Sequence, residues 1–291
     1  MRMRQLGTGA GEATAIGFGG MHLSIQDRPT EDQSIRVLHA ALEAGVRFID
    51  TADVYCLDQK EIGHNERLIA RALRLWRGPA ERVVVATKGG LIRPDGRWER
   101  DARPERLHRA CERSLKALEV EQIALYQLHA PDHQVPFAES VGALAALQKE
   151  GKIRWVGLSN VTVEQIKEAE RIVPITTVQN RLNPFFREAL EDGVVRYCTE
   201  RGIGFLAYSP TGGGRLTKKL PGLPVLKAMA GRTGASAHAL VLAWVLAQSP
   251  RVIAIPSARQ EAHAIDSASA ADLTLSAEDL KAIDTAEFSK A

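Results

Sequence analysis

The chain of 291 residues is 45% hydrophobic and 25% charged, the composition of an ordinary globular protein. Its net charge of +3 is too small to indicate nucleic-acid binding, and its longest apolar run, HALVLAWVLAQ, is too short to span a membrane. The cysteines, Cys56, Cys111 and Cys198, are widely spaced and predict neither a disulfide framework nor a CxxC metal site. Because the N-terminus lacks an apolar signal core, we expect a cytoplasmic protein.

Short β-rich runs alternate with helical patterns along the chain. The strands are expected at 15–20, 46–50, 82–88, 123–129, 153–159, 175–180, 203–209 and 251–256. Helices with caps or helical periodicity are expected at 30–45, 103–120, 135–151, 162–173, 187–202 and 235–249, and an additional C-terminal helix at 275–288. The helix at 235–249 is apolar on nearly all sides and should be buried. This alternation predicts an α/β protein with a parallel sheet and helical crossovers.

The number of strands favours a closed barrel over an open sheet. Eight strand–helix units in a chain of this length are typical of a (β/α)8 TIM barrel. A doubly wound open sheet is the alternative, but the chain has no GxGxxG after its first strand and no GxxxxGK[ST] motif. No linker or low-complexity stretch divides the chain, so residues 1–291 are expected to form a single domain.

Polar residues stand where the predicted strands end. In a TIM barrel the carboxyl ends of all strands meet at one face, where the active site lies. The sequence therefore predicts that one cleft collects the following residues: Asp50 and Tyr55, Lys88, His129, Ser159 and Asn160, Gln179, and Tyr208 and Ser209.

The first residues of this set suit the reduction of a carbonyl group. A tyrosine is an inefficient proton donor at neutral pH, and a nearby ammonium such as Lys88 is expected to lower its pKa. Asp50 would balance the charge of a buried Lys88, and His129 would donate a hydrogen bond to a polarised oxygen. Each residue alone has a common structural interpretation, but their joint placement favours a catalytic site. Since none of them supplies a hydride, a nicotinamide coenzyme is implied.

Several motifs resemble those of the aldo-keto reductase family over nearly the whole chain. FIDTADVY followed by GHNERLIARAL resembles the segment around the family's aspartate and tyrosine. ATKGG, LYQLHAPD, KIRWVGLSN, VQNRLNPF and FLAYSP follow in the family's order. The resemblance implies a (β/α)8 barrel closed at the bottom by an N-terminal β-hairpin. It also implies an extended NADPH bound without a Rossmann domain.

The resemblance also implies roles for individual residues. The catalytic residues would be Asp50, Tyr55, Lys88 and His129, with Tyr55 acting as the acid in reduction and as the base in oxidation. Around the nicotinamide the expected residues are Gly20, Met21, Asp50, Ser159, Asn160, Gln179 and Tyr208. Around the pyrophosphate they are Ser209, Pro210, Thr211, Gly212, Gly213 and Lys219.

The adenosine end departs from the family pattern. Ser257 and Arg259 stand where the family binds the 2′-phosphate, but His263 stands where Arg or Gln is usual. Asp266 and Ser267 replace a Glu-Asn pair that usually holds adenine. NADP is therefore the expected coenzyme, with NAD as an alternative.

These features together predict an NADP(H)-dependent carbonyl reductase acting on a small molecule. The alternatives are a dehydrogenase oxidising a sugar or pyridoxal-type alcohol, and a cofactor-binding regulatory subunit of an ion channel. The intact set of catalytic residues favours an enzyme, and a barrel isomerase would leave AYSP and IPSAR unexplained. The substrate pocket is expected to be open on one side and bordered by Met21, His22, Val54, Tyr55 and Trp98. The sequence specifies neither one carbonyl compound nor an oligomeric state.

Overall fold

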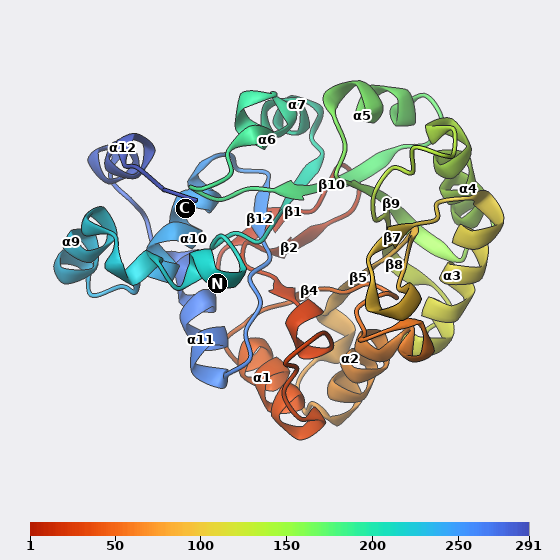
Figure 1. The fold of residues 1–291 in the computed structure, drawn as a ribbon, viewed down its shortest axis with the longest axis horizontal. Coiled ribbons are helices and arrows are strands. Elements are labelled where there is room, and N and C mark those ends of the chain that lie inside the picture. Colours follow the sequence, from red (N-terminus) through yellow and green to blue (C-terminus); the bar gives the residue numbers. More distant parts are fainter. Residues whose placement is uncertain (291) are drawn as a thin grey trace.

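The computed structural model describes residues 1–290. Eight parallel strands form a barrel at the centre of the molecule (Figure 1). The strands are β3 (Phe18–Gly19), β4 (Phe48–Asp50), β5 (Val84–Gly89), β8 (Ile123–Leu128), β9 (Ile153–Ser159), β10 (Ile175–Arg181), β11 (Gly204–Tyr208) and β12 (Val252–Ala254). They pair in chain order from β3 to β12. A parallel bridge between Ile16 and Ala254 joins the two ends of the sheet. The predicted TIM barrel is therefore confirmed, and the open sheet is not formed.

Helices form the outer layer around the strands (Figure 1). They are α1 (Glu31–Glu43), α2 (His64–Leu75), α3 (Pro104–Leu118), α4 (Phe137–Lys149), α5 (Val163–Glu170), α6 (Glu188–Glu191), α7 (Val194–Arg201), α8 (Gly214–Thr217), α9 (Pro224–Thr233), α10 (Ala237–Ala247), α11 (Glu261–Ser269) and α12 (Ala277–Thr285). As predicted, α10 is almost entirely buried, and the C-terminal α12 begins with a capping box on Ser276. Within residues 1–290 no helix has the length and apolar character needed to cross a bilayer.

Several helical regions differ from the prediction. The helix expected at 187–202 is divided into α6 and α7, because Gly193 between them adopts a left-handed conformation with φ of 79°. Helices α8, α9 and α11 were not among the expected helices, and neither was α2. Helix α2 begins after Gly63, a left-handed glycine that makes no side-chain cap, so the usual Ser, Thr or Asp start signal is missing.

The N-terminal hairpin closes the amino-terminal end of the barrel. Strands β1 (Met3–Gln5) and β2 (Glu12–Thr14) are antiparallel, and the buried Leu6 between them packs on the barrel interior. At Gly204, the start of β11, an added Cβ would lie 1.9 Å from the carbonyl oxygen of Leu6. This close approach of the two backbones requires glycine and fixes the hairpin against the barrel.

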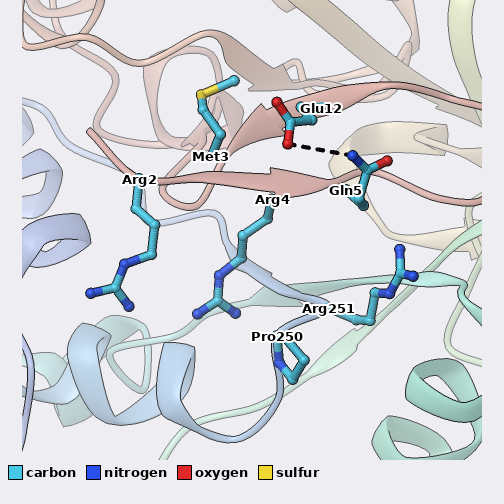
Figure 2. A pocket seen from close by; sticks show the side chains of 7 residues that line it. All are labelled: Arg2, Met3, Arg4, Gln5, Glu12, Pro250 and Arg251. Carbon is cyan, nitrogen blue, oxygen red and sulfur yellow. Dashed lines mark hydrogen bonds between the residues drawn. The ribbon is translucent and has the colours of Figure 1, made fainter.

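A buried arginine ties the hairpin to the end of α10. A hollow of about 520 Å³ lies beside the hairpin. In Figure 2 the Arg4 side chain reaches from β1 toward the segment at Pro250. The Arg4 guanidinium donates hydrogen bonds to the carbonyl oxygens of Leu246 (2.8 Å), Ser249 (2.5 Å) and Val252 (2.6 Å). Carbonyls at a helix C-terminus lack intrahelical partners and favour a cation. Burial, together with the charge of Arg2, lowers the pKa of Arg4 to about 10, so the group stays charged at neutral pH.

Replacing Arg4 should therefore weaken the fold. We expect Arg4→Met to lower the free energy of unfolding by about 2–4 kcal/mol, because buried carbonyls lose charged donors. Urea denaturation at neutral pH measures the change. Arg2→Met is the matched control, since Arg2 is exposed and makes a single long hydrogen bond of 3.4 Å to Thr274, and it should change stability by less than about 1 kcal/mol. Equal losses in both variants would contradict the role of Arg4.

Candidate active site

The carboxyl ends of the strands open into a cleft of about 1270 Å³. Side chains along a strand alternate between its two faces, so Asp50 points into the barrel like Phe48, and Lys88 like Ala86. The same alternation brings Gln179 from β10 and His129, which follows β8, to this end of the interior. The strand ends thus bring together the polar residues that the sequence predicts there.

Lys88 lies at the centre of these groups and has no exposed surface. Its Nζ donates to Asp50 Oδ2 at 2.6 Å, to Tyr55 Oη at 2.9 Å and to the backbone oxygen of Thr51 at 2.9 Å. Burial acts to lower the pKa of Lys88, but the attraction to Asp50 and Tyr55 outweighs it and raises the pKa above 10.5. Lys88 is therefore a permanent cation in contact with a phenol and a carboxylate.

The pKa of Tyr55 differs from the prediction. Burial raises it above the ordinary value of 10.0, and the Lys88 ammonium acts in the lowering direction without reversing the net change. The predicted lowering is thus present as one contribution but wrong as the net result, because the phenol is only 7% exposed. Tyr55 keeps its proton at neutral pH and has that proton available to donate.

His129 faces Tyr55 across the floor of the cleft. The two rings have centroids 5.8 Å apart and meet edge to face at 80°. Burial, followed by the charge of Lys88, holds the pKa of His129 well below 6.5, so its imidazole is neutral. Its Nδ1 is buried without a hydrogen-bond partner in the described residues. A neutral imidazole at this position offers a hydrogen bond to an oxygen placed beside Tyr55.

The outer wall near Tyr55 is apolar and aromatic. Met21, Leu91 and Trp98 line it, with His22 beside them. Trp98 is 46% exposed, lies 6.4 Å from the Tyr55 ring, and carries the Arg93 guanidinium 4.0 Å from its own ring centre. Val54, which was also expected at this wall, is fully buried in a cluster with Ala52 and Tyr55 and does not line the cleft.

Polar side chains next to this wall form a connected group. Asn160 Nδ2 donates to the backbone oxygen of His129 at 3.0 Å and to Ser159 Oγ at 3.1 Å, and Tyr208 donates to Asn160 Oδ1 at 2.8 Å. Gln179 Nε2 donates to Asp50 Oδ1 at 2.7 Å, so the amide nitrogen of Gln179 is already hydrogen-bonded within the protein. Asn160 and Ser209 have φ angles of 60° and 47°, a left-handed conformation that is uncommon for such residues. Strain of this kind is typical of binding sites.

Farther along, the cleft passes the glycine-rich segment after β11. Ser209, Pro210, Thr211 and Gly213 line it, together with Lys218. Lys219 is not among the residues of the wall, and neither are Gly20 and Gly212. An added Cβ at Gly20 would lie 2.3 Å from Asn65 Oδ1, and one at Gly212 would lie 3.1 Å from the Phe185 ring. These two glycines allow close packing behind the cleft surface.

The far end of the cleft contains groups suited to an anion. Ser257 Oγ is buried without a hydrogen-bond partner in the described residues, and Arg259 is exposed nearby in the same wall. The Arg259 guanidinium donates to the backbone oxygens of His22 (3.4 Å) and Gln26 (3.0 Å). His263, Asp266 and Ser267 also line this end, and Asp266 accepts a hydrogen bond of 2.7 Å from Ser236. An unpartnered hydroxyl and an exposed guanidinium fit a phosphate group.

Comparison with known proteins agrees with this geometry. The model of the Aldo/keto reductase family matches residues 15–287. The chain belongs to the aldo/keto reductase family. An uncharacterised oxidoreductase of Schizosaccharomyces pombe is 37% identical over an alignment of 268 residues that covers 90% of this chain and 83% of that protein.

Solved structures of aldo/keto reductases also share the fold. One from Klebsiella pneumoniae, in complex with NADP and acetate, has a TM-score of 0.83 at 28% identity, covering 98% of this chain and 95% of that chain. The glycerol dehydrogenase from Gluconobacter oxydans has a TM-score of 0.82 at 30% identity, covering 94% of this chain and 91% of that chain.

Two buried features of this aldo/keto reductase were not predicted from its sequence. Gln127 Nε2 donates to Asp50 Oδ1 at 3.3 Å, beneath the floor of the cleft. Asp53, which follows Asp50 in FIDTADVY, is fully buried away from the cleft, next to Glu66. Burial and the charge of Glu66 raise the pKa of Asp53 to about 7. Although Asp53 is close to Asp50 in sequence, it does not line the cleft.

Proposed function

We propose that this aldo/keto reductase reduces an aldehyde or ketone to an alcohol, with NADPH as coenzyme and Tyr55 as the general acid. The observation that carries the proposal is the chain of contacts from Asp50 through Lys88 to Tyr55 at the floor of the cleft. A protonated phenol, a fixed cation behind it and a neutral imidazole beside it suit a reaction in which negative charge develops on an oxygen.

In this mechanism the substrate oxygen accepts hydrogen bonds from Tyr55 Oη and from the His129 ring. When bound, NADPH would supply the hydride for the new C–H bond at the carbonyl carbon and would leave as NADP⁺. Tyr55 gives its proton to the oxygen as the C=O double bond becomes a single bond. The Lys88 ammonium stabilises the phenolate that remains, and Asp50 keeps the ammonium in place. Tyr55 then regains a proton from solvent.

The coenzyme assignment is supported by the residues along the cleft. Ser159, Asn160 and the free oxygen of Gln179 are assigned to the nicotinamide carboxamide, and Tyr208 to the nicotinamide ring. The segment from Ser209 to Gly213 is assigned to the pyrophosphate, and Ser257 with Arg259 to the 2′-phosphate. The Klebsiella pneumoniae aldo-keto reductases with the same fold were crystallised with NADP and with NADPH. His263, Asp266 and Ser267 are assigned to the adenosine end.

The proposed substrate is a small, neutral carbonyl compound. Met21, Leu91 and Trp98 form the wall nearest Tyr55, and an apolar wall favours apolar or aromatic groups next to the carbonyl. A second candidate is the reverse reaction, oxidation of an alcohol with Tyr55 as the base, because the Gluconobacter oxydans relative is a glycerol dehydrogenase. The complete set of Asp50, Tyr55, Lys88 and His129 favours an enzyme over a regulatory subunit.

Removing the phenolic hydroxyl tests the role of Tyr55. We expect Tyr55→Phe to lower kcat for carbonyl reduction by about 10²–10⁴-fold, the range attributed to general acid catalysis. NADPH consumption at 340 nm with a panel of aldehydes and ketones measures it. NADPH affinity, followed by fluorescence quenching, should remain within about twofold, since the hydroxyl is assigned no coenzyme contact. Turnover close to that of wild type would remove Tyr55 from the mechanism.

Replacing Arg259 tests the coenzyme preference. A guanidinium binds a phosphate through charge-assisted hydrogen bonds, each contributing about 1.5–3 kcal/mol, so Arg259→Ala should weaken NADPH binding about tenfold to a hundredfold. NADH lacks the 2′-phosphate and serves as the matched ligand, with little expected change. Fluorescence titration of both coenzymes gives the two dissociation constants. Equal losses for NADPH and NADH would show that Arg259 does not bind the 2′-phosphate.

A further inference from the structure

One layer of inward-facing residues contains Lys88 and lies below Tyr55 and His129. Lys88 on β5 pairs in register with Gln127 on β8. Gln127 in turn pairs with Gly157 on β9, and Gly157 pairs with Thr177 on β10. The layer thus runs continuously from the catalytic lysine around one side of the barrel. Gln127 has no exposed surface and is not part of the cleft wall, so it has no access to a substrate or coenzyme.

Gln127 contacts the carboxylate that balances the charge of Lys88. Asp50 uses its two oxygens differently. Its Oδ2 accepts from Lys88 Nζ at 2.6 Å, whereas its Oδ1 accepts from Gln179 Nε2 at 2.7 Å and from Gln127 Nε2 at 3.3 Å. Gln179 Nε2 also lies 3.5 Å from Gln127 Oε1, so the two amides are linked to each other. A buried carboxylate needs such donors, because water cannot replace them.

The absence of a side chain at Gly157 provides the space for Gln127. An added Cβ at Gly157 would lie 2.7 Å from Gln127 Cγ and 2.5 Å from Thr177 Oγ1. Such distances cannot be accommodated without moving one of these side chains. The amide of Gln127 therefore reaches Asp50 only because the neighbouring strand carries glycine at the same level.

We propose that Gln127 is a positioning residue for the reaction: its amide holds the Asp50 carboxylate in the orientation in which Lys88 bridges Asp50 and Tyr55. This inference rests on the proposed function. Without the Gln127 donor, Asp50 Oδ1 keeps only the hydrogen bond from Gln179. The Asp50 carboxylate is then free to rotate away from Lys88. The charge of Asp50 is then also less compensated. That charge raises the pKa of Tyr55, so its effect on Tyr55 becomes stronger.

The test compares kinetics of wild type with those of Gln127→Met, which keeps the length of the side chain and removes its hydrogen bonds. The expected result is a fall in kcat for reduction of about threefold to tenfold, the scale of one weak hydrogen bond. KM and the dissociation constant of NADPH should be unchanged, because Gln127 does not reach the cleft. In alcohol oxidation, the pH at which the rate stops rising should move upward, in the direction of a higher Tyr55 pKa.

Two further variants separate positioning from packing. Thr177→Val is the matched control, because Thr177 is fully buried in the same layer and its hydroxyl has no hydrogen-bond partner in the described residues. It should keep the wild-type kcat and pH profile. Gly157→Ala retains the amide of Gln127 but displaces it, and it should lower kcat as Gln127→Met does. It also provides the test if Gln127→Met fails to fold, as judged by circular dichroism and NADPH binding.

The possible outcomes lead to different conclusions. Folded Gln127→Met and Gly157→Ala variants with wild-type kcat and wild-type pH profile would overturn the positioning role and leave the proposed function intact. A loss of kcat in Thr177→Val equal to that in Gln127→Met would also overturn it, since packing alone would then explain the effect. A wild-type enzyme that consumes no NADPH with any carbonyl compound would overturn both proposals.

Discussion

The buried ion pair between Lys88 and Asp50 is the interaction on which the site depends. Both side chains are at most 3% exposed, so neither charge is stabilised by water. A buried ion pair is stable only when its remaining donors and acceptors are also satisfied, and removing one partner leaves the other charge uncompensated, at a cost of roughly 3–5 kcal/mol. The remaining hydrogen bonds of this pair go to Tyr55, Thr51, Gln179 and Gln127. The groups assigned to proton transfer and the groups that hydrogen-bond the buried charges therefore form one network.

The barrel supplies the geometry that this network needs. Parallel strands in register place residues from different parts of the sequence at the same level, and closure at Ile16 and Ala254 makes the arrangement rigid. The N-terminal hairpin, held by Arg4, covers the opposite end of the interior. Toward the cleft the network ends at Tyr55 and His129, which face the space for a substrate.

The sequence was sufficient to predict the barrel and the position of Asp50, Lys88 and His129, because strand ends are recognisable and a barrel brings them to one face. It was insufficient for Gln127, although the signal was present: in IALYQLH, Gln127 shares the inward face with Leu125 and His129. A single polar residue inside a strand does not reveal its partner. The raised pKa of Tyr55 also required the structure, since it depends on how deeply the phenol is buried.

The central claim is that the Lys88 ammonium lowers the pKa of Tyr55 against the larger effect of burial, and the pH dependence of alcohol oxidation tests it most directly. In the proposed mechanism oxidation needs an ionised Tyr55, so its rate should rise with pH until Tyr55 is fully ionised. Lys88 acts to lower the pKa of Tyr55, and in Lys88→Met the pH at which the rate stops rising should move upward, with a lower rate at neutral pH. The claim would be contradicted if Lys88→Met lowered the oxidation rate at every pH but the rate stopped rising at the same pH as in the wild type.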